Sequence, residues 1–249
     1  PVPADLLRIR GDATRGKPAQ LVAFGAPCTG ALAGRGCKAT SPETLPTIAG
    51  TVQASLAGMP ADFMLMRSGP AGIAIDRDAL TMLPALPAAA RELQMVARVF
   101  PGRSRVALGE DATESAVRAA RVEPGAVLMF ATHGLAAGAF GLSEPGLVLT
   151  PPQTPSREDD GLLTAAEVSA LKLPDAFVIL SACNTAGVRS IEALDPYAGF
   201  ARAFFAAGAK SLLVTQFEVA DEAAARLTTR TLADVKKGVG RSEALRRSV

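Results

Sequence analysis

The single histidine of this 249-residue chain and one of its three cysteines each follow an apolar run of strand length. His133 comes after the run at 126–131, and Cys183 comes after the run at 176–181. A free thiol has a pKa of about 8.5 and is largely protonated at neutral pH, whereas a neighbouring imidazole can accept its proton. The pair therefore predicts covalent catalysis, with Cys183 as the nucleophile and His133 as its base.

Gly134 supplies a second element of such a site. A glycine has no side chain, so its backbone N–H can approach a substrate carbonyl closely. The N–H groups of Gly134 and Cys183 are predicted to form an oxyanion hole. We expect a backbone carbonyl to orient the imidazole, because the side chain of Asn184 should diverge from the ring.

Both candidate residues also have a purely structural interpretation. A lone cysteine at a strand end is usually a small buried hydrophobe, and a lone histidine is often a hydrogen-bonded core residue. Their joint position, at the ends of two strands of one sheet, favours the functional interpretation.

The elements that position the two residues alternate between strand and helix patterns, which is typical of an α/β domain with a mainly parallel sheet. Strands are predicted at 20–25, 105–108, 126–131, 176–181 and 210–216, and helices at 85–100, 113–121, 195–207 and from 221 onward. Thr164 and Glu167 form a capping-box pattern at a further helix start. Ligands of such sheets bind beyond the carboxyl ends of the strands, where His133 and Cys183 are expected.

Two segments rich in turn-forming residues, 26–59 and 134–161, are predicted to be less ordered. The second follows the histidine directly and contains four prolines between 145 and 155. Such a loop is a natural element for an activator to order.

Composition argues against several classes of partner. Lys and Arg number 26 against 24 Asp and Glu, and no long basic run is interleaved with aromatics, so direct nucleic-acid binding is not expected. The segment 25–30 lacks the lysine of a phosphate-binding loop, and no nucleotide cofactor is predicted. No metal site is predicted, because Cys28 and Cys37 are nine residues apart and one histidine cannot complete a site.

Location and extent are also suggested by the sequence. Three cysteines are too few for a disulfide scaffold, which favours a reducing cytoplasm. The uncharged stretch 125–143 is interrupted by glycines, Thr132 and His133, so no membrane span is predicted. The chain is interpreted as part of a longer polypeptide, with 1–20 as a linker or the end of an upstream region and 21–249 as one domain.

Four blocks of this sequence resemble the CHAT family of caspase-like proteins, in the expected order. They are ATHG at 131–134, DGLLTAAEV at 160–168, LSACNT at 180–185 and GFARAFFAAGAKS at 199–211. The resemblance covers roughly 86 to the C-terminus, and the first eighty residues match only loosely. Two features depart from the family pattern: the segment 216–219 replaces an aromatic–proline pair, and Asn184 replaces an acidic residue.

The resemblance implies a caspase-like three-layer α/β/α fold with a mainly parallel sheet, a dyad of His133 and Cys183, and cleavage of peptide bonds in protein substrates. It also implies a fused helical-repeat domain of the tetratricopeptide type or an activator protein, and a role in bacterial signalling or defence. Relatives that cut after basic residues carry an acid in the substrate pocket. The candidates for this acid are Asp159, Asp160, Glu192, Asp195 and Glu218, with Asp160 and Glu218 preferred.

Three functions remain open at this point. The first is a cytoplasmic cysteine endopeptidase. The second is a catalytically inactive caspase-like module that binds partners or transmits a signal. The third is an amidase that uses the same dyad on small substrates, although the loop at 135–160 suits an extended peptide better.

Overall fold

The structure is a computed structural model. It describes residues 17–30, 37, 56, 59–60, 62–69, 72–156, 158–181, 198–214 and 221–249. Its main element is a parallel sheet of five strands in the order β10-β9-β5-β1-β4. These strands are β1 (Leu21–Gly25), β4 (Ser104–Leu108), β5 (Val127–Ala131), β9 (Phe177–Ser181) and β10 (Ser211–Val214). All five correspond to the predicted strands.

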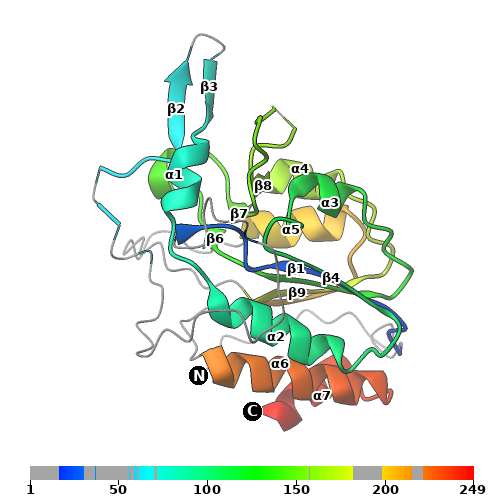
Figure 1. Cartoon of the computed structure of the whole chain (residues 1–249). Coiled ribbons are helices and arrows are strands. Elements are labelled where there is room, and N and C mark those ends of the chain that lie inside the picture. Colours follow the sequence, from blue (N-terminus) through cyan, green and yellow to red (C-terminus); the bar gives the residue numbers. More distant parts are fainter. Residues whose placement is uncertain are drawn as a thin grey trace.

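Helices cover both faces of the sheet (Figure 1). On one face lie α2 (Pro87–Ala97), α6 (Asp221–Lys236) and α7 (Arg241–Ser248). On the other lie α3 (Glu114–Arg118), α4 (Ala165–Ser169) and α5 (Ala198–Ala206). The predicted α/β class and its three-layer arrangement, compatible with a caspase-like fold, are confirmed.

Each face of the sheet has its own hydrophobic core, because successive strand residues point to opposite sides. In β1, Val22 and Phe24 face the core under α3, α4 and α5. Leu21 and Ala23 face the core under α2. All four are completely buried, as expected for a central parallel strand.

Side-chain caps fix the starts of two of the helices. The Thr164 hydroxyl accepts from the Glu167 N–H and the Glu167 carboxylate accepts from the Thr164 N–H, which confirms the capping box of α4. Asp76 caps α1 (Arg77–Met82), since its carboxylate accepts from the N–H groups of Asp78 and Ala79.

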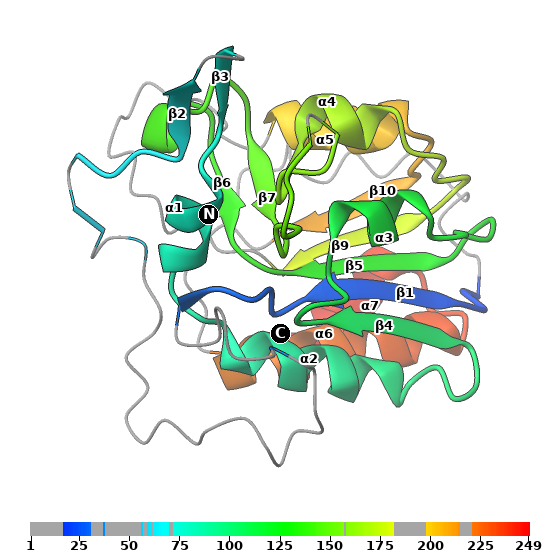
Figure 2. The ribbon, with the colours of Figure 1, turned by 45° about the horizontal axis from the view of Figure 1, so that its top comes forward.

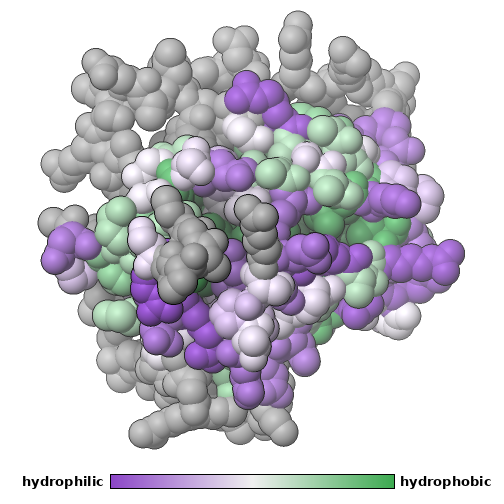
Figure 3. Space-filling view, turned by 90° about the horizontal axis from the view of Figure 1, so that it is seen from above, coloured by the Kyte–Doolittle hydropathy of each residue, from purple (hydrophilic) through white to green (hydrophobic). Residues whose placement is uncertain are grey.

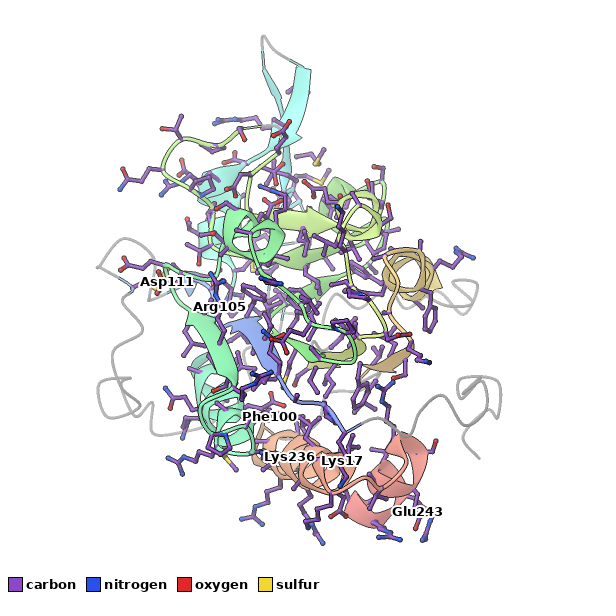
Figure 4. The ribbon with its side chains drawn as sticks, turned by 90° about the vertical axis from the view of Figure 1, so that its right-hand side faces the viewer. Lys17, Phe100, Arg105, Asp111, Lys236 and Glu243 are labelled. Carbon is purple, nitrogen blue, oxygen red and sulfur yellow. A yellow bond between two sulfur atoms is a disulfide. The ribbon has the colours of Figure 1, made fainter. Side chains whose placement is uncertain are left out.

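A cation of α6 binds to the turn that follows α2. The Lys236 ammonium donates to the Val99 carbonyl and lies 5.3 Å from the centre of the Phe100 ring, and Figure 4 shows these elements side by side. The contact combines a charge-assisted hydrogen bond with a cation–π interaction.

A second, antiparallel sheet lies beyond the carboxyl edge of the first (Figure 2). It contains β6 (Gly134–Leu135), β7 (Gly146–Val148) and β8 (Leu162–Thr164), with a 3-10 turn at Ala139–Gly141 between the first two strands. The segment 134–161 is therefore more ordered than its glycine and proline content predicted. Its apolar side chains, among them Leu135 and Leu142, are buried in a third core.

The hairpin of β2 (Met66–Gly69) and β3 (Gly72–Ile75) projects from the body of the molecule and was not predicted (Figure 1). Its base is joined to the loop after His133, since the Leu65 N–H donates to the Phe140 carbonyl at 3.0 Å. Phe63 packs edge-on against the Phe140 ring. The hairpin is thus connected to the segment that carries β6.

The structure joins Cys28 and Cys37 in a disulfide, although the small number of cysteines predicted no disulfide scaffold. The Glu110 N–H donates to the Cys37 carbonyl at 3.0 Å and draws this residue back to the edge of the sheet. Gly109 permits the approach: it has a φ of +56°, and a β-carbon there would lie 2.2 Å from the Cys37 carbonyl oxygen. Such a meeting depends on tertiary contacts that a spacing of nine residues does not reveal.

In the described part of the chain, no helix is long and apolar enough to cross a membrane. On the face shown in Figure 3, hydrophilic and hydrophobic residues are interspersed among the described surface residues.

Glu114, on α3, is a carboxyl with no solvent exposure that holds the turn before β8. It accepts from the N–H groups of Asp160 and Gly161 at 2.8 and 2.7 Å, and from Arg118 at 3.2 Å. Burial raises the pKa of Glu114 to about 7, against the opposing effect of the backbone hydrogen bonds. Burial also raises the pKa of Asp160, to about 6.

These shifts predict that the protein loses stability as the pH rises toward 7. Because the folded-state pKa of Glu114 lies above its ordinary value of 4.5, the folded chain holds the proton more tightly than the unfolded chain. The resulting stabilisation is complete below pH 4.5 and is lost as the pH rises through about 7. Thermal unfolding of Glu114→Gln should therefore show a smaller fall in midpoint between pH 5 and pH 8.

The matched control is Glu158→Gln, which removes an exposed carboxyl from the same loop. It should keep the pH dependence of the wild type. Parallel melting curves for Glu114→Gln and the wild type across this range would contradict the role assigned to Glu114.

Candidate catalytic site

The carboxyl edge of β5 and β9 is where the candidate residues leave the sheet. The two strands are neighbours in the sheet (Figure 2). Their register pairs Ala131 with Ser181, the last residue of each. His133 follows Ala131 by two residues, and Cys183 follows Ser181 by the same number. Cys183 itself lies outside the described residues. The matched register brings the two exits to the same level of the sheet.

The His133 ring is almost fully buried, at 3% exposure, and its Nε2 lies 2.7 Å from the carbonyl oxygen of Pro84. A carbonyl only accepts hydrogen bonds, so Nε2 carries the proton and Nδ1 is the basic nitrogen of the neutral ring. The expectation that a backbone carbonyl orients His133 is confirmed. Pro84 itself was not predicted, because every residue has a carbonyl and its partner depends on the fold.

Burial also lowers the pKa of His133, and the hydrogen bond to Pro84 opposes this effect. Desolvation disfavours the charged imidazolium, so the ring is held in its neutral form near pH 7. A neutral imidazole is the form that can take a proton from a thiol.

The backbone on either side of the ring is held by β7. The Val148 N–H donates to the His133 carbonyl at 2.9 Å, and the Thr132 hydroxyl donates to the Val148 carbonyl at 2.5 Å. His133 is therefore fixed through both its main chain and its ring.

Gly134 occupies a non-hydrogen-bonded pair of the antiparallel ladder. It lies opposite Leu147, and the Val148 N–H bonds across to the carbonyl of His133, one position before Gly134. In such a ladder, hydrogen-bonded and non-hydrogen-bonded pairs alternate, so the Gly134 N–H points away from β7. Because β6 is the edge strand in the order β6-β7-β8, this N–H lies on the side of β6 that pairs with no further strand of the described sheet, although Gly134 itself is buried.

The end of β9 is attached to α2 by a buried acid. The Ser181 hydroxyl donates to a carboxylate oxygen of Glu92 at 2.7 Å, and Glu92 is buried. This contact, just before the Cys183 segment, was not predicted. Glu92 occupies a helix position that would ordinarily be read as a solvated charge.

The candidate substrate-binding acids fall into two groups. Asp159 and Asp160 lie beside α3, where Asp159 is 3.7 Å from Arg118 and Asp160 accepts from the Leu162 N–H at 3.0 Å. Both contacts belong to the turn before β8, whose Asp160 and Gly161 N–H groups donate to the Glu114 carboxylate. The other candidates, Glu192, Asp195 and Glu218, lie outside the described residues, as does Asn184.

Among the described residues, no group of three or more His, Cys, Asp or Glu side chains is arranged to hold a metal ion. The chemistry that the described arrangement supports is that of a neutral imidazole and a backbone N–H next to the exit of β9.

The fold and site together define an α/β protein of three layers, with a carbonyl-oriented histidine at the carboxyl edge of a parallel sheet. The chain belongs to the CHAT domain family, whose model matches residues 1–249. This family is related to the caspase-like cysteine peptidases. No curated protein matches the chain in sequence.

Because His133 is the single histidine, its protonation can be observed directly by NMR of protein labelled at histidine. We expect one imidazole signal, in the neutral Nε2–H form near pH 7, with a pKa below the ordinary value of about 6.5. A titration midpoint at or above this value, or a dominant Nδ1–H form, would contradict the contact with Pro84 and the burial of the ring.

Proposed function

We propose that this chain is a cysteine endopeptidase that cleaves protein or peptide substrates through His133 and Cys183. The observation that carries the proposal is the parallel register of β5 and β9, which ends both strands at matched positions. Neighbouring strands of a sheet lie about 4.8 Å apart, so residues that follow them at equal distance are suited to a thiol–imidazole contact.

In the proposed reaction, Nδ1 of His133 takes the proton of the Cys183 thiol, and the thiolate attacks the peptide carbonyl carbon. The carbonyl oxygen gains the negative charge. The imidazolium then donates its proton to the leaving nitrogen, the C–N bond breaks and a thioester remains. Water, deprotonated by the same imidazole, hydrolyses the thioester and restores the thiol.

The outward N–H of Gly134 supports the proposed oxyanion hole. This N–H points away from the β6–β7 ladder, and the proposal makes it one donor to the developing oxyanion, with the Cys183 N–H as the second donor. Asp160 and Glu218 remain the proposed substrate-binding candidates.

The burial of His133 supports a latent enzyme, because a substrate carbonyl needs access to this edge. We propose that a fused helical-repeat domain or an activator protein provides this access in bacterial signalling or defence. A cytoplasmic location belongs to the same proposal, although the Cys28–Cys37 disulfide weighs against it, since disulfides are rare in that compartment.

The same burial favours a second candidate function, a catalytically inactive caspase-like module. A histidine with 3% exposure and a satisfied Nε2 also fits a structural role. In that case, the site would bind partners without cleaving them.

The two functions are separated by comparing the wild type with Cys183→Ala on a proteome-derived peptide library. We expect new amino termini with shared flanking residues only in the wild-type sample, because alanine removes the nucleophile. Sequencing of the new termini provides the readout. Cys183→Ser is the matched control: it keeps the shape of the side chain and should lose nearly all activity, since its hydroxyl is a far weaker nucleophile.

Equal cleavage by Cys183→Ala and the wild type would exclude the mechanism. Absence of cleavage in both, even with the proposed helical-repeat domain or activator protein added, would favour the inactive module.

A second prediction concerns Gly134→Val. The added side chain should hinder approach of the substrate carbonyl to the N–H and lower kcat/KM by about 100- to 1000-fold, the cost of losing one oxyanion donor. The smaller Gly134→Ala variant should lose less activity, and thermal melting should verify that both variants fold. Unchanged turnover in Gly134→Val would refute the role of Gly134.

A further inference from the structure

The carbonyl oxygen of Pro84 accepts two hydrogen bonds from distant parts of the chain. One comes from Nε2 of His133 at 2.7 Å, and the other comes from the hydroxyl of Thr29 at 2.9 Å. Thr29 has no solvent exposure. The acceptor that orients the histidine is therefore itself held by a buried side chain.

The Pro84 peptide needs such support because of its place in the fold. It lies in the connection between α1 and α2, outside any helix or strand. Among the described contacts, its carbonyl oxygen accepts from two side chains, Thr29 and His133, and these hydrogen bonds hold the carbonyl in its observed direction.

Gly30 adds a steric contact to the same peptide. It has a φ of +55°, and a β-carbon there would lie 2.7 Å from the Ala85 nitrogen and 3.1 Å from the Leu83 carbonyl oxygen. The backbone at Gly30 thus packs directly against the segment that contains Pro84. A larger residue would displace this segment from His133.

The segment that carries Thr29 is anchored on its other side. The Cys28 N–H donates to the Thr150 hydroxyl at 2.9 Å, and this hydroxyl donates to the Gly109 carbonyl at 2.6 Å. The disulfide with Cys37 fixes Cys28 further. Thr29 therefore extends from a well-fixed loop toward Pro84.

We propose that Thr29 is a positioning residue for His133, acting through the carbonyl of Pro84. The Thr29 hydroxyl fixes the direction of this carbonyl, and the carbonyl fixes the Nε2–H tautomer and the ring plane. Nδ1 is thereby left as the basic nitrogen of the ring. The catalytic consequence rests on the proposed function, whereas the effect on the ring does not.

The test uses Thr29→Val, which keeps the shape of the side chain and removes the hydroxyl. In the NMR spectrum of the single histidine, we expect faster solvent exchange of the Nε2–H and an increased population of the Nδ1–H tautomer. We also expect kcat to fall by about 10- to 100-fold with little change in KM, since the base is misplaced while the substrate site is intact. Thr29→Ser should restore both properties.

The matched control is Thr231→Val. Thr231 is a fully buried threonine of α6 whose hydroxyl has no hydrogen-bond partner in the described part of the chain. It should leave the His133 signals unchanged. An equal change in both variants would show a general effect of core substitution and would overturn the proposal.

A measurement on the wild type decides the matter if Thr29→Val does not fold. The Thr29 hydroxyl proton and the His133 Nε2–H share one acceptor, so a nuclear Overhauser effect should connect them. Its absence, or a folded Thr29→Val with wild-type tautomer and exchange, would refute the positioning role. If every form stays inactive even with the proposed helical-repeat domain or activator protein added, the proposed function fails and the NMR results still decide this inference.

Discussion

The parallel pairing of β5 with β9 is the constraint on which the site depends. Both strands are buried on both faces, so any slip of register would displace large apolar side chains from two cores at once. A change in the pairing of Ala131 with Ser181 would therefore cost much of the free energy of burial of these side chains. Packing of ordinary hydrophobic residues thereby fixes where the chain turns away from the sheet, before any polar contact is made.

The polar contacts around His133 build on that edge. β7 holds the main chain of the histidine, while Pro84, which follows α1, holds its ring. Burial and hydrogen bonding act in opposite directions on the pKa of His133, and burial has the larger effect. A neutral ring with a defined tautomer follows from this balance without any carboxylate partner among the described contacts of the ring.

The sequence predicted the five central strands and the principal helices because their apolar periodicity is strong and local. It also predicted His133 at a strand exit and a backbone carbonyl as its partner. It did not predict Pro84, Thr29 or Glu92, since their roles arise where segments at least 49 residues apart in the chain meet. The order of the segment after His133 was missed because its glycines and prolines indicated a loop, while its leucines and valine are buried in two cores that only the folded chain provides.

The acceptor for His133 belongs to the main chain, and this has a genetic consequence. Any amino acid at position 84 supplies the same backbone carbonyl, so no single substitution there removes the acceptor group itself. Alanine scanning, which changes only side chains, would not detect this contact, although it orients the ring. Its loss requires a change of backbone path, and such changes are produced at positions like Gly30, remote in sequence from the histidine that they affect.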